Sequence, residues 1–597
     1  MEFRLARTLT KIFRDTVATR GARSAVQFRE QGTWRSLSWL ELAAKGDVVA
    51  AGLIGMGIEK GDRISILGNT CLEWILADLG VMMSGAATVT IYQSNTASEC
   101  AFIISNSESS IVFAEDQEQV DKLKSIRAEI PSVRKVIVFA GEGDGDWVVT
   151  LDEVMANGEA ALAADENVVS TREATITADD LICLIYTSGT TGLPKGVVLT
   201  HENMGYEAES VENVRILSEE DVQLLFLPLA HVFAQVLKAA WIATGHQLAL
   251  TSMDTLLDDM AEVRPTLMAS VPRLFEKVYT GVVGKVRGAS GLKGALGNWA
   301  LDVGDEMAQR CIDGGKPGGL KWALAKKLVF AKIAATLDEK FGGRLRFFVS
   351  GGAPLSPRIA YFFDFADVEI LEGYGMTEST AATCVNRSGE GRIGTVGPVL
   401  PGTQVKIATD GEICIKGPGV MKEYWRLPEQ TAETIRDGWL HTGDIGEFDD
   451  GYLKITGRKK ELIVTAGGKN VAPAKIEGLL AANQYIAHAV VHGDKRKYLS
   501  ALVTLDPENL KTWADEQGLA FDDLSSASKD PQVVALVQSV FDSVNSGLAR
   551  YETIKKFRVL PVEFELGDEL TPTLKVKRNV VEKKFAEDLE SMYGESF

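Results

Sequence analysis

The chain has 597 residues, of which 45% are hydrophobic and 24% are charged, and it carries a formal net charge of −19. This length exceeds what one hydrophobic core usually supports, so two or more domains are expected. The acidic balance, with a sequence pI of about 5.0, argues against general nucleic-acid binding, which needs a positive field. Anionic substrates would therefore need locally basic pockets.

The cysteines and histidines indicate neither a disulfide framework nor a zinc site. The six cysteines are spread without a CxxC pair, which fits a reduced, cytosolic chain. The six histidines show no HExxH spacing, so we expect no catalytic zinc. Charges interrupt the apolar positions of residues 1–17, and no run of about 18 apolar residues follows. We therefore expect neither a signal peptide nor a transmembrane helix.

The first part of the chain alternates between helix and strand patterns. Helices are predicted over 39–53, through Leu79 and Met83, and over 117–126, and strands over 63–68, 111–113 and 135–139. Such alternation predicts a largely parallel sheet with helices on both faces.

Residues 284–320 are rich in Gly and Lys and resemble an insertion before the strand predicted at 345–349. Within the following helix, one stripe carries the apolar residues Trp322, Val329, Ile333 and Leu337, with lysines nearby. A packed helix with solvated lysines is the favoured interpretation, and a membrane-surface helix is the alternative.

From residue 394 to 456 the pattern changes to short strands and turns, at 404–407, 411–416 and 451–456. This change indicates a small β subdomain over about 390–457. We predict an α/β fold in which a large N-terminal domain (1–457) combines layered α/β structure with this subdomain. A charged junction at 458–460 then leads to a smaller α+β domain (461–597).

The strongest chemical signal is the segment YTSGTTGLPKG at residues 186–196, which follows an apolar strand at 181–185. Its glycines allow tight turns, its hydroxyls and amide N–H groups can surround a phosphate, and Lys195 adds a charge. It is not a Walker motif, because the Gly–Lys–Ser/Thr junction is absent. An ordinary glycine-rich surface loop would not explain this run of hydroxyl and glycine residues.

Further motifs follow in order. They are SGGAP at 350–354, GYGMTE at 373–378, WLHTGD at 439–444, YLKITGRKKE at 452–461 and LTPTLKVKR at 570–578. With these motifs the chain resembles, along essentially its whole length, the acyl-adenylate-forming superfamily of acyl-CoA synthetases, luciferases and adenylation domains. The resemblance implies that the small C-terminal domain is mobile.

The motifs suit the chemistry that the resemblance implies. A carboxylate is a poor electrophile, and its attack on the α-phosphate of ATP gives a mixed anhydride with a good leaving group. Such a catalyst must bring two anions together and stabilise charge on phosphate oxygens, which positioning and electrostatics can provide.

By this resemblance, Tyr374 lies near the adenine, Thr377 contacts the α-phosphate and Glu378 holds Mg²⁺, which accepts a single carboxylate beside phosphate oxygens. Asp444 accepts both ribose hydroxyls, and Arg458 approaches the same ribose. The full nucleotide-binding set is Thr187, Ser188, Gly189, Thr190, Thr191, Gly192, Lys195, Gly351, Gly352, Ala353, Glu372, Gly373, Tyr374, Gly375, Met376, Thr377, Asp444, Arg458 and Lys575.

Four residues are expected to be catalytic: Lys575, Thr190, Lys195 and His231. Lys575 matches the family lysine that bridges the carboxylate and the α-phosphate. It follows Leu574, where many members have Ser-Gly-Lys, and this form resembles the long-chain branch. A solvated strand edge is the alternative for the basic cluster. His231, in LPLAHVFAQ, is expected at the acid-binding site.

The family uses one active site twice, since its C-terminal domain rotates after adenylation. Lys460 corresponds to the hinge position. The loop with Gly467 and Gly468 would then line the route of the coenzyme A pantetheine, because backbone without side chains can lie close to an extended ligand.

The acid is less defined by the sequence. The segment 271–279 and the insertion resemble long-chain synthetases, in which the acyl tail runs in a tunnel and each buried CH₂ contributes roughly 0.8 kcal/mol. Some relatives carry a tryptophan gate at the place of Gln235, so the sequence leaves undecided whether this chain has such a gate. Residues 232–235 hold no aspartate for an amino-acid substrate, and no carrier domain follows Lys575.

We therefore expect an enzyme that uses ATP and Mg²⁺ to activate a long-chain fatty acid and transfers the acyl group to coenzyme A. One alternative is a fatty acyl-AMP ligase that loads an acyl carrier protein. A non-catalytic sensor is disfavoured because Lys195, Glu378, Asp444 and Lys575 are all present. A cytoplasmic location is expected, with peripheral membrane contact as an option. Chain length, oligomeric state and pathway stay open.

Overall fold

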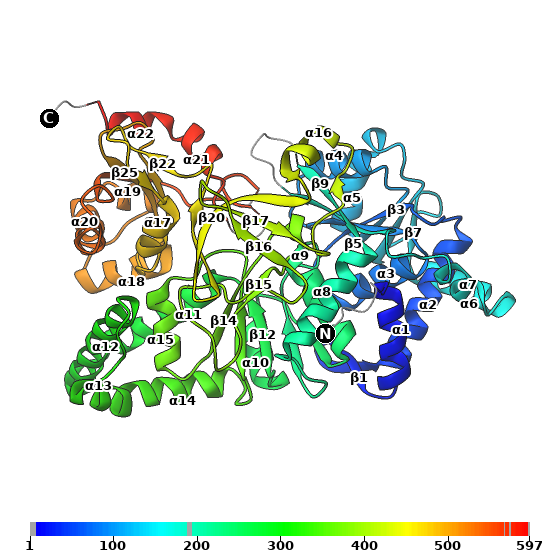
Figure 1. Cartoon of the computed structure of the whole chain (residues 1–597), viewed down its shortest axis with the longest axis horizontal. Coiled ribbons are helices and arrows are strands. Elements are labelled where there is room, and N and C mark those ends of the chain that lie inside the picture. Colours follow the sequence, from blue (N-terminus) through cyan, green and yellow to red (C-terminus); the bar gives the residue numbers. More distant parts are fainter. Residues whose placement is uncertain (1–6, 188–193, 566, 572–574, 595–597) are drawn as a thin grey trace.

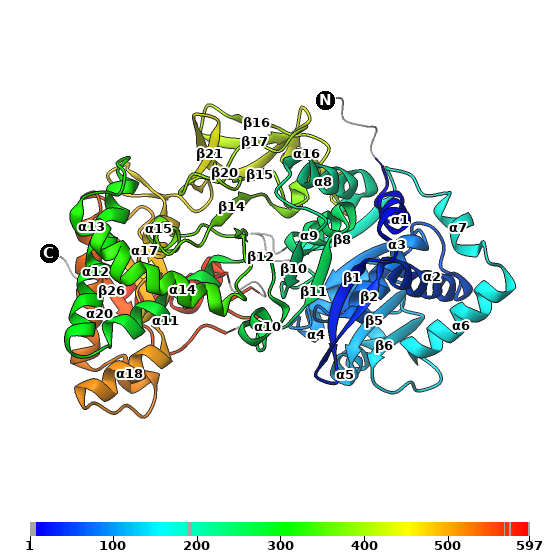
Figure 2. The same ribbon diagram turned by 90° about the horizontal axis from the view of Figure 1, so that it is seen from below.

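The computed structural model describes residues 7–187, 194–565, 567–571 and 575–594. Two large sheets, a smaller β region beside them and a separate C-terminal domain make up the molecule (Figures 1 and 2). The α/β fold class is confirmed, as is the division into a large N-terminal and a smaller C-terminal domain.

The first large sheet has the strand order β15-β14-β13-β12-β10-β11-β1-β2 and is parallel except at its two edges. Its strands are β1 (Ser24–Glu30), β2 (Thr33–Ser38), β10 (Val222–Leu225), β11 (Gln247–Leu250), β12 (Leu267–Ser270), β13 (Phe347–Ser350), β14 (Ile370–Tyr374) and β15 (Cys384–Val385).

The second large sheet has the order β18-β9-β8-β4-β3-β5-β6-β7, with antiparallel pairing only at the β8–β9–β18 edge. Its strands are β3 (Arg63–Leu67), β4 (Ala87–Ile91), β5 (Ile111–Asp116), β6 (Lys135–Ala140), β7 (Val148–Thr150), β8 (Leu181–Thr187), β9 (Lys195–Thr200) and β18 (Glu423–Tyr424). The predicted strands at 63–68, 111–113 and 135–139 all lie here.

Helices cover the faces of both sheets, as the alternating pattern predicts (Figure 1). Capping boxes at Ser38/Glu41, Thr96/Glu99 and Thr150/Glu153 mark where three of them begin. The helices are α1 (Leu9–Arg20), α2 (Trp39–Gly55), α3 (Leu72–Met83), α4 (Ala97–Ser107), α5 (Gln117–Ser125), α6 (Leu151–Ala164), α7 (Val168–Glu173), α8 (His201–Val214), α9 (Val232–Thr244), α10 (Leu256–Val263), α11 (Pro272–Arg287), α12 (Gly291–Ile312), α13 (Leu320–Ala325), α14 (Ala331–Lys340), α15 (Pro357–Phe365) and α16 (Pro428–Thr434), with the short turns η1 (Arg127–Glu129), η2 (Lys326–Phe330) and η3 (Thr377–Ser379).

The segment interpreted as a Gly/Lys-rich insertion, residues 284–320, covers the end of α11, all of α12 and the start of α13. Its glycines permit close helix packing: a Cβ at Gly304 would lie 2.6 Å from the Phe330 ring. Val329, Ile333 and Leu337 are buried in the same core, and Trp322 packs against it. The packed-helix interpretation of this stripe is confirmed, and the membrane-surface alternative is wrong for these four residues.

A buried charge pair lies between α3 and α9. Lys238 pairs with Asp78, whose other oxygen accepts the Thr88 hydroxyl at 2.6 Å. Lys238 also donates to Gln235 Oε1 at 2.7 Å, and Gln235 Nε2 donates to the Leu229 carbonyl at 2.7 Å. The residue at the gate position is therefore a buried hydrogen-bonding group that stabilises the loop leading to α9.

The β subdomain is a five-stranded antiparallel sheet. Its strands are β16 (Gln404–Ile407), β17 (Glu412–Lys416), β19 (Ile435–Arg436), β20 (Trp439–Asp449) and β21 (Tyr452–Arg458). The subdomain limits of about 390–457 and the hinge at 458–460 stay predictions.

The C-terminal domain has its own hydrophobic core around a three-stranded sheet. Its elements are β22 (Ile463–Val464), β23 (Asn470–Val471), α17 (Pro473–Ala481), β24 (Ile486–His492), β25 (Leu499–Leu505), α18 (Pro507–Gln517), α19 (Leu524–Ala527), α20 (Pro531–Ser546), β26 (Ile554–Val559), α21 (Arg578–Lys584) and α22 (Ala586–Ser591).

One carboxyl group is buried without a charged partner. The side chain of Glu207 on α8 is fully buried, and within the described residues no hydrogen bond of ordinary geometry reaches either oxygen. The Ala382 N–H lies near enough to favour ionisation slightly, but burial dominates and raises the pKa of Glu207 well above its usual value. Burial therefore favours the neutral form of this carboxyl group in the folded protein.

We predict that Glu207→Gln stabilises the protein as pH rises. The pKa of Glu207 is higher in the folded protein than the value of about 4.3 in the unfolded chain, so between these two pKa values only the folded wild type holds the Glu207 proton. As pH rises through this range, the wild type loses up to about 1.4 kcal/mol of unfolding free energy per pH unit. Unfolding midpoints at pH 4.5 and pH 7 measure this, with Glu202→Gln on the same helix as control. An equal gain at both pH values would contradict the assignment.

Candidate active site

Asp444 lies at the junction of the first sheet, the β subdomain and the start of the C-terminal domain. Its Oδ2 accepts the Tyr374 hydroxyl at 2.7 Å, and its Oδ1 accepts Arg458 Nε at 2.9 Å. The carboxylate is 8% exposed. Three residues expected at the nucleotide therefore form one hydrogen-bonded group.

Local structure explains how they meet. Tyr374 is the last residue of β14, Asp444 lies in β20, and Arg458 ends β21. Antiparallel pairing of β20 with β21 sets Asp444 directly opposite Arg458. Burial and the Asp444 carboxylate raise the pKa of Tyr374, so its hydroxyl stays a donor.

The GYGMTE segment turns sharply after β14. A Cβ at Gly375 would lie 1.3 Å from the Ala381 carbonyl oxygen, so the turn requires glycine at this position. The turn leads into η3, where Thr377 and Glu378 are both buried. Met376 packs on the β-subdomain core.

The SGGAP segment follows β13, the strand beside β14. Gly352 has φ +83°, and a Cβ at Gly351 would lie 3.1 Å from the Phe233 ring, which belongs to the His231 segment. Glu372 of β14 accepts the Leu355 N–H at 3.3 Å, and burial raises its pKa to about 7. Ala353 lies in the SGGAP segment, and Gly373 lies in β14 at the start of GYGMTE.

The phosphate motif lies between two paired strands. Thr187 ends β8 and pairs with Lys195, which begins β9. The motif therefore joins two antiparallel strands. A Walker loop instead leads from a strand into a helix, which agrees with the absence of the Walker pattern from this sequence. Ser188, Gly189, Thr190, Thr191 and Gly192 lie outside the described residues.

Lys195 and Glu378 contact the same aromatic side chain. Lys195 Nζ lies 4.9 Å from the centroid of the Tyr424 ring, and the Tyr424 hydroxyl donates to Glu378 Oε1 at 2.7 Å. Within the described residues this is the hydrogen bond that the Glu378 carboxylate accepts.

His231 caps the N-terminus of α9. Its Nδ1 accepts the Phe233 N–H at 3.1 Å, which leaves Nε2 as the protonated nitrogen of the neutral ring. Burial, with a smaller effect of Lys575, lowers its pKa to about 3. The ring is therefore an uncharged donor at physiological pH.

Lys575 extends from the C-terminal domain to this site. It interacts electrostatically with His231 and with Arg458 and Asp444. The Lys575 side chain is exposed to solvent, although nearby protein atoms partly desolvate its ammonium group. Desolvation, and then Arg458, lowers its pKa. Lys575 therefore lies within electrostatic range of both His231 and the Asp444 group.

The expected hinge and coenzyme A residues are separate from this group. Lys460 is exposed just after β21, while Gly467 and Gly468 lie exposed in the turn between β22 and β23. Backbone hydrogen bonds join this turn to Arg496 of the same domain.

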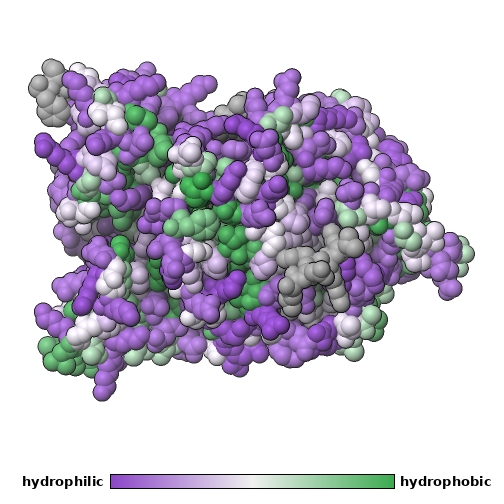
Figure 3. All heavy atoms as spheres, in the orientation of Figure 1, coloured by the Kyte–Doolittle hydropathy of each residue, from purple (hydrophilic) through white to green (hydrophobic). Residues whose placement is uncertain are grey.

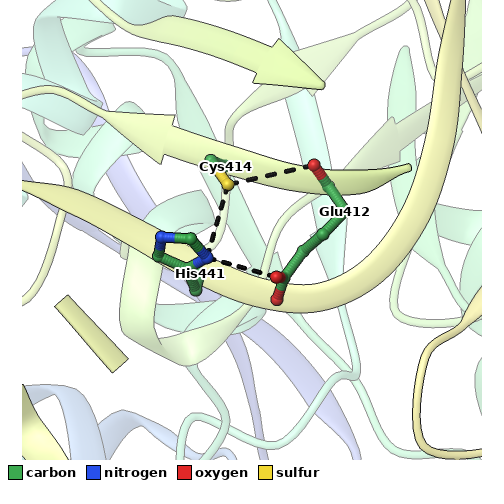
Figure 4. A group of neighbouring side chains, drawn as sticks. All are labelled: Glu412, Cys414 and His441. Carbon is green, nitrogen blue, oxygen red and sulfur yellow. Dashed lines mark hydrogen bonds and ion pairs between the residues drawn. The ribbon is translucent and has the colours of Figure 1, made fainter. Parts of the chain in front are cut away.

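Glu412, Cys414 and His441 lie close together on β17 and β20 (Figure 4). Glu412 accepts His441 Nδ1 at 3.1 Å, Lys459 Nζ at 3.1 Å and the Gly443 N–H at 2.9 Å, so its oxygens are already occupied. Burial raises the pKa of Cys414, so its thiol stays protonated. Hydrogen bonding accounts for the group, and Glu412 fixes the backbone next to Asp444.

Sequence reasoning missed Tyr424, Glu412 and Lys459. Lys459 N donates to the Gly443 carbonyl at 2.7 Å, so the charged junction is hydrogen-bonded to the TGD segment. Lys459 lies inside a recognised motif, whereas Tyr424 and Glu412 lie between motifs. The pairing of β18 with β9 and of β17 with β20 brings Tyr424 and Glu412 to the site, and no local sequence pattern indicates these pairings.

The family model of AMP-binding enzymes matches residues 13–425, and the model of the AMP-binding enzyme C-terminal domain matches residues 460–596. This chain belongs to the AMP-binding enzyme family. This family member is 38% identical to the long-chain-fatty-acid–CoA ligase FadD15 of Mycobacterium tuberculosis, over 94% of this chain and 93% of that one. It is also 32% identical to the peroxisomal long chain acyl-CoA synthetase 7 of Arabidopsis thaliana, over 95% of this chain and 83% of that one.

Solved structures share the fold of this family member. The A domain of a carboxylic acid reductase from Segniliparus rugosus, solved in complex with AMP and a co-purified carboxylic acid, matches with a TM-score of 0.75 and 20% identity. The match covers 99% of this chain and 94% of that one, so the whole AMP-binding enzyme, including the C-terminal domain, follows the shared fold.

We predict that Tyr374→Phe weakens ATP binding. The substitution keeps the ring but removes the donor to Asp444, and a hydrogen bond to a charged group contributes about 1.5 kcal/mol or more. The KM for ATP should rise by roughly tenfold. Tyr452→Phe is the control, because its hydroxyl donates to the Glu390 carbonyl at the exposed rim. An unchanged KM in Tyr374→Phe would exclude this role.

Proposed function

We propose that this enzyme activates a long-chain fatty acid with ATP as an acyl-adenylate and transfers the acyl group to coenzyme A, giving acyl-CoA, AMP and pyrophosphate. The names of the relatives support this acid and this acceptor. The observation that carries the proposal is the hydrogen-bonded group of Tyr374, Asp444 and Arg458, which lies within electrostatic range of Lys575.

The nucleotide would lie between the two large sheets and the β subdomain. Asp444 would accept the ribose hydroxyls, since each carboxylate oxygen has a lone pair beyond those used by Tyr374 and Arg458. Lys195 and the hydroxyls of residues 187–191 would surround the phosphates. The glycine-containing segments at 351–353 and 373–377 would allow backbone to approach the base and the α-phosphate.

The residues present fit Mg²⁺. Glu378 is a buried carboxylate with one oxygen held by Tyr424, and a single carboxylate beside phosphate oxygens satisfies this ion. When bound, Mg²⁺ would neutralise charge on the phosphate oxygens. The chain itself supplies the positions of Glu378 and Lys195.

The acid would meet the α-phosphate beside Lys575 and His231. The His231 Nε2–H can donate to the carboxylate, and the Lys575 ammonium can contact both anions and reduce their repulsion. Thr190 and Lys195 would contact the phosphates as charge moves to the leaving pyrophosphate. Burial of the acyl chain would add roughly 0.8 kcal/mol for each CH₂.

Thioester formation would use the same site after a rotation at Lys460. The turn with Gly467 and Gly468 would then approach the site and line the route of coenzyme A. The alternative acceptor is an acyl carrier protein. Product analysis with coenzyme A or carrier protein, across saturated acids from acetate to stearate, separates the two acceptors and gives the preferred chain length.

We predict that Lys575→Ala reduces acid-dependent ATP–pyrophosphate exchange by about 100-fold, as loss of a charge-stabilising donor does elsewhere. Thioester formation from preformed acyl-AMP should change little, because the α-phosphate is no longer attacked. Lys577→Ala is the control, since its ammonium donates to the Gly567 carbonyl. Equal losses in both half-reactions would rule out the proposed role.

We also propose a cytoplasmic enzyme that contacts membranes peripherally. No helix in the described part of the chain is long and apolar enough to span a bilayer. A leucine ridge, defined as Ile312, Leu320, Leu324 and Leu328, is exposed at one corner of the molecule, where green appears at the lower left of Figure 3. Lys316, Lys321 and Lys327 are exposed and close to it in the sequence, and they would attract anionic lipids.

We predict that Leu320→Gln/Leu324→Gln lowers partitioning onto phosphatidylglycerol vesicles by about tenfold, or ~1.4 kcal/mol. Vesicle sedimentation measures it. Leu257→Gln is the control, because Leu257 on α10 is 52% exposed outside the ridge. Unchanged partitioning would exclude the ridge as the contact surface.

A further inference from the structure

The two-residue strand β18 joins two motifs that are far apart in the sequence. Its edge pairing with β9 sets Tyr424 opposite Val197, two residues after Lys195. Just before it, Met421 N donates to the Glu378 carbonyl at 2.8 Å, and just after it Trp425 N donates to the Gly196 carbonyl at 2.7 Å. The backbone of this segment is therefore fixed to both motifs.

The Tyr424 side chain then contacts the functional group of each motif. It is 5% exposed, its hydroxyl donates to Glu378 Oε1 at 2.7 Å, and Lys195 Nζ lies 4.9 Å from its ring centroid. A lysine over an aromatic face is attracted by the ring quadrupole.

This geometry has two consequences for charge. The phenol holds one oxygen of Glu378 and leaves the other for a cation, and Mg²⁺ demands near-ideal octahedral positions of its ligands. The ring also offers the Lys195 ammonium a cation–π contact as an alternative to an ion pair with the Glu378 carboxylate. A direct pair between them would neutralise both groups before a nucleotide arrives.

We propose that Tyr424 is a positioning residue that directs the Glu378 carboxylate toward Mg²⁺ and holds Lys195 for the phosphates. This inference rests on the proposed function, because it assumes that Glu378 and Lys195 meet Mg²⁺ and ATP. Tyr424 itself touches neither the acid nor the nucleotide. The hydroxyl serves the carboxylate and the ring serves the lysine, so the two roles can be separated by substitution.

The test measures ATP binding by calorimetry over a range of Mg²⁺ concentrations, and with EDTA, in the full-length protein without fatty acid. Tyr424→Phe keeps the ring and removes the hydroxyl. It should raise the Mg²⁺ concentration for half-maximal enhancement of ATP binding by about five- to tenfold, as loss of a hydrogen bond to a charged group implies. Metal-free ATP binding should stay within about twofold of wild type.

Tyr424→Leu also removes the ring, and it should weaken metal-free ATP binding by about threefold or more, within the range of cation–π energies. Tyr206→Phe is the matched control, because Tyr206 is equally buried and its hydroxyl donates to the Pro401 carbonyl at 2.9 Å. It should lower thermal stability without changing the Mg²⁺ dependence.

A wild-type Mg²⁺ dependence in Tyr424→Phe would overturn the proposal. So would an equal shift in Tyr206→Phe, because the effect would then follow from any lost buried hydroxyl. ATP–pyrophosphate exchange with fatty acids, measured in parallel on the wild type, judges the proposed function separately. Absence of exchange would refute that function, while the binding titration would still decide the role of Tyr424.

Discussion

The active site depends on one carboxylate at the meeting point of three structural units. Asp444 of the β subdomain accepts hydrogen bonds from Tyr374, at the end of a sheet strand, and from Arg458, at the last strand before the C-terminal domain. A buried carboxylate needs such donors, because an unpaired charge is costly away from water. Its requirement for partners therefore fixes how the sheet, the subdomain and the junction approach one another.

Other polar groups, most of them buried, stabilise the segments that carry this arrangement. The Asp78–Lys238 pair and Gln235 stabilise the loop that ends at His231, and Glu412 with Lys459 fixes the backbone beside Asp444. Removing one member of such a buried pair leaves an uncompensated charge, which is why these networks resist change.

The C-terminal domain adds a charged residue, Lys575, to the site. Lys575 interacts electrostatically with His231 and with the Asp444 group, and it lowers the pKa of His231 further. Desolvation and the nearby Arg458 also lower the pKa of Lys575 itself. An anionic substrate beside Lys575 and Arg458 would favour their charged forms, in a protein of net charge −19.

The sequence by itself determined the α/β class, the two-domain organisation and most of the residues that surround Asp444. This was achievable because glycine-rich turns and ordered motifs are local signals, and a turn such as Gly375 tolerates no other residue. The limits of the β subdomain and the hinge remain predictions. Thr190 and its neighbours lie outside the described residues, so their expected roles are predictions as well.

Only the tertiary structure decided which residues connect these motifs. Tyr424 joins Lys195 to Glu378 because β18 pairs with β9, and no short-range pattern specifies that pairing. The same holds for the stripe of Trp322, which could face lipid or protein until the packing of α12 buried it, and for the leucine ridge left exposed beside it. Periodicity shows that a helix has an apolar face, but contacts between distant segments decide what covers that face.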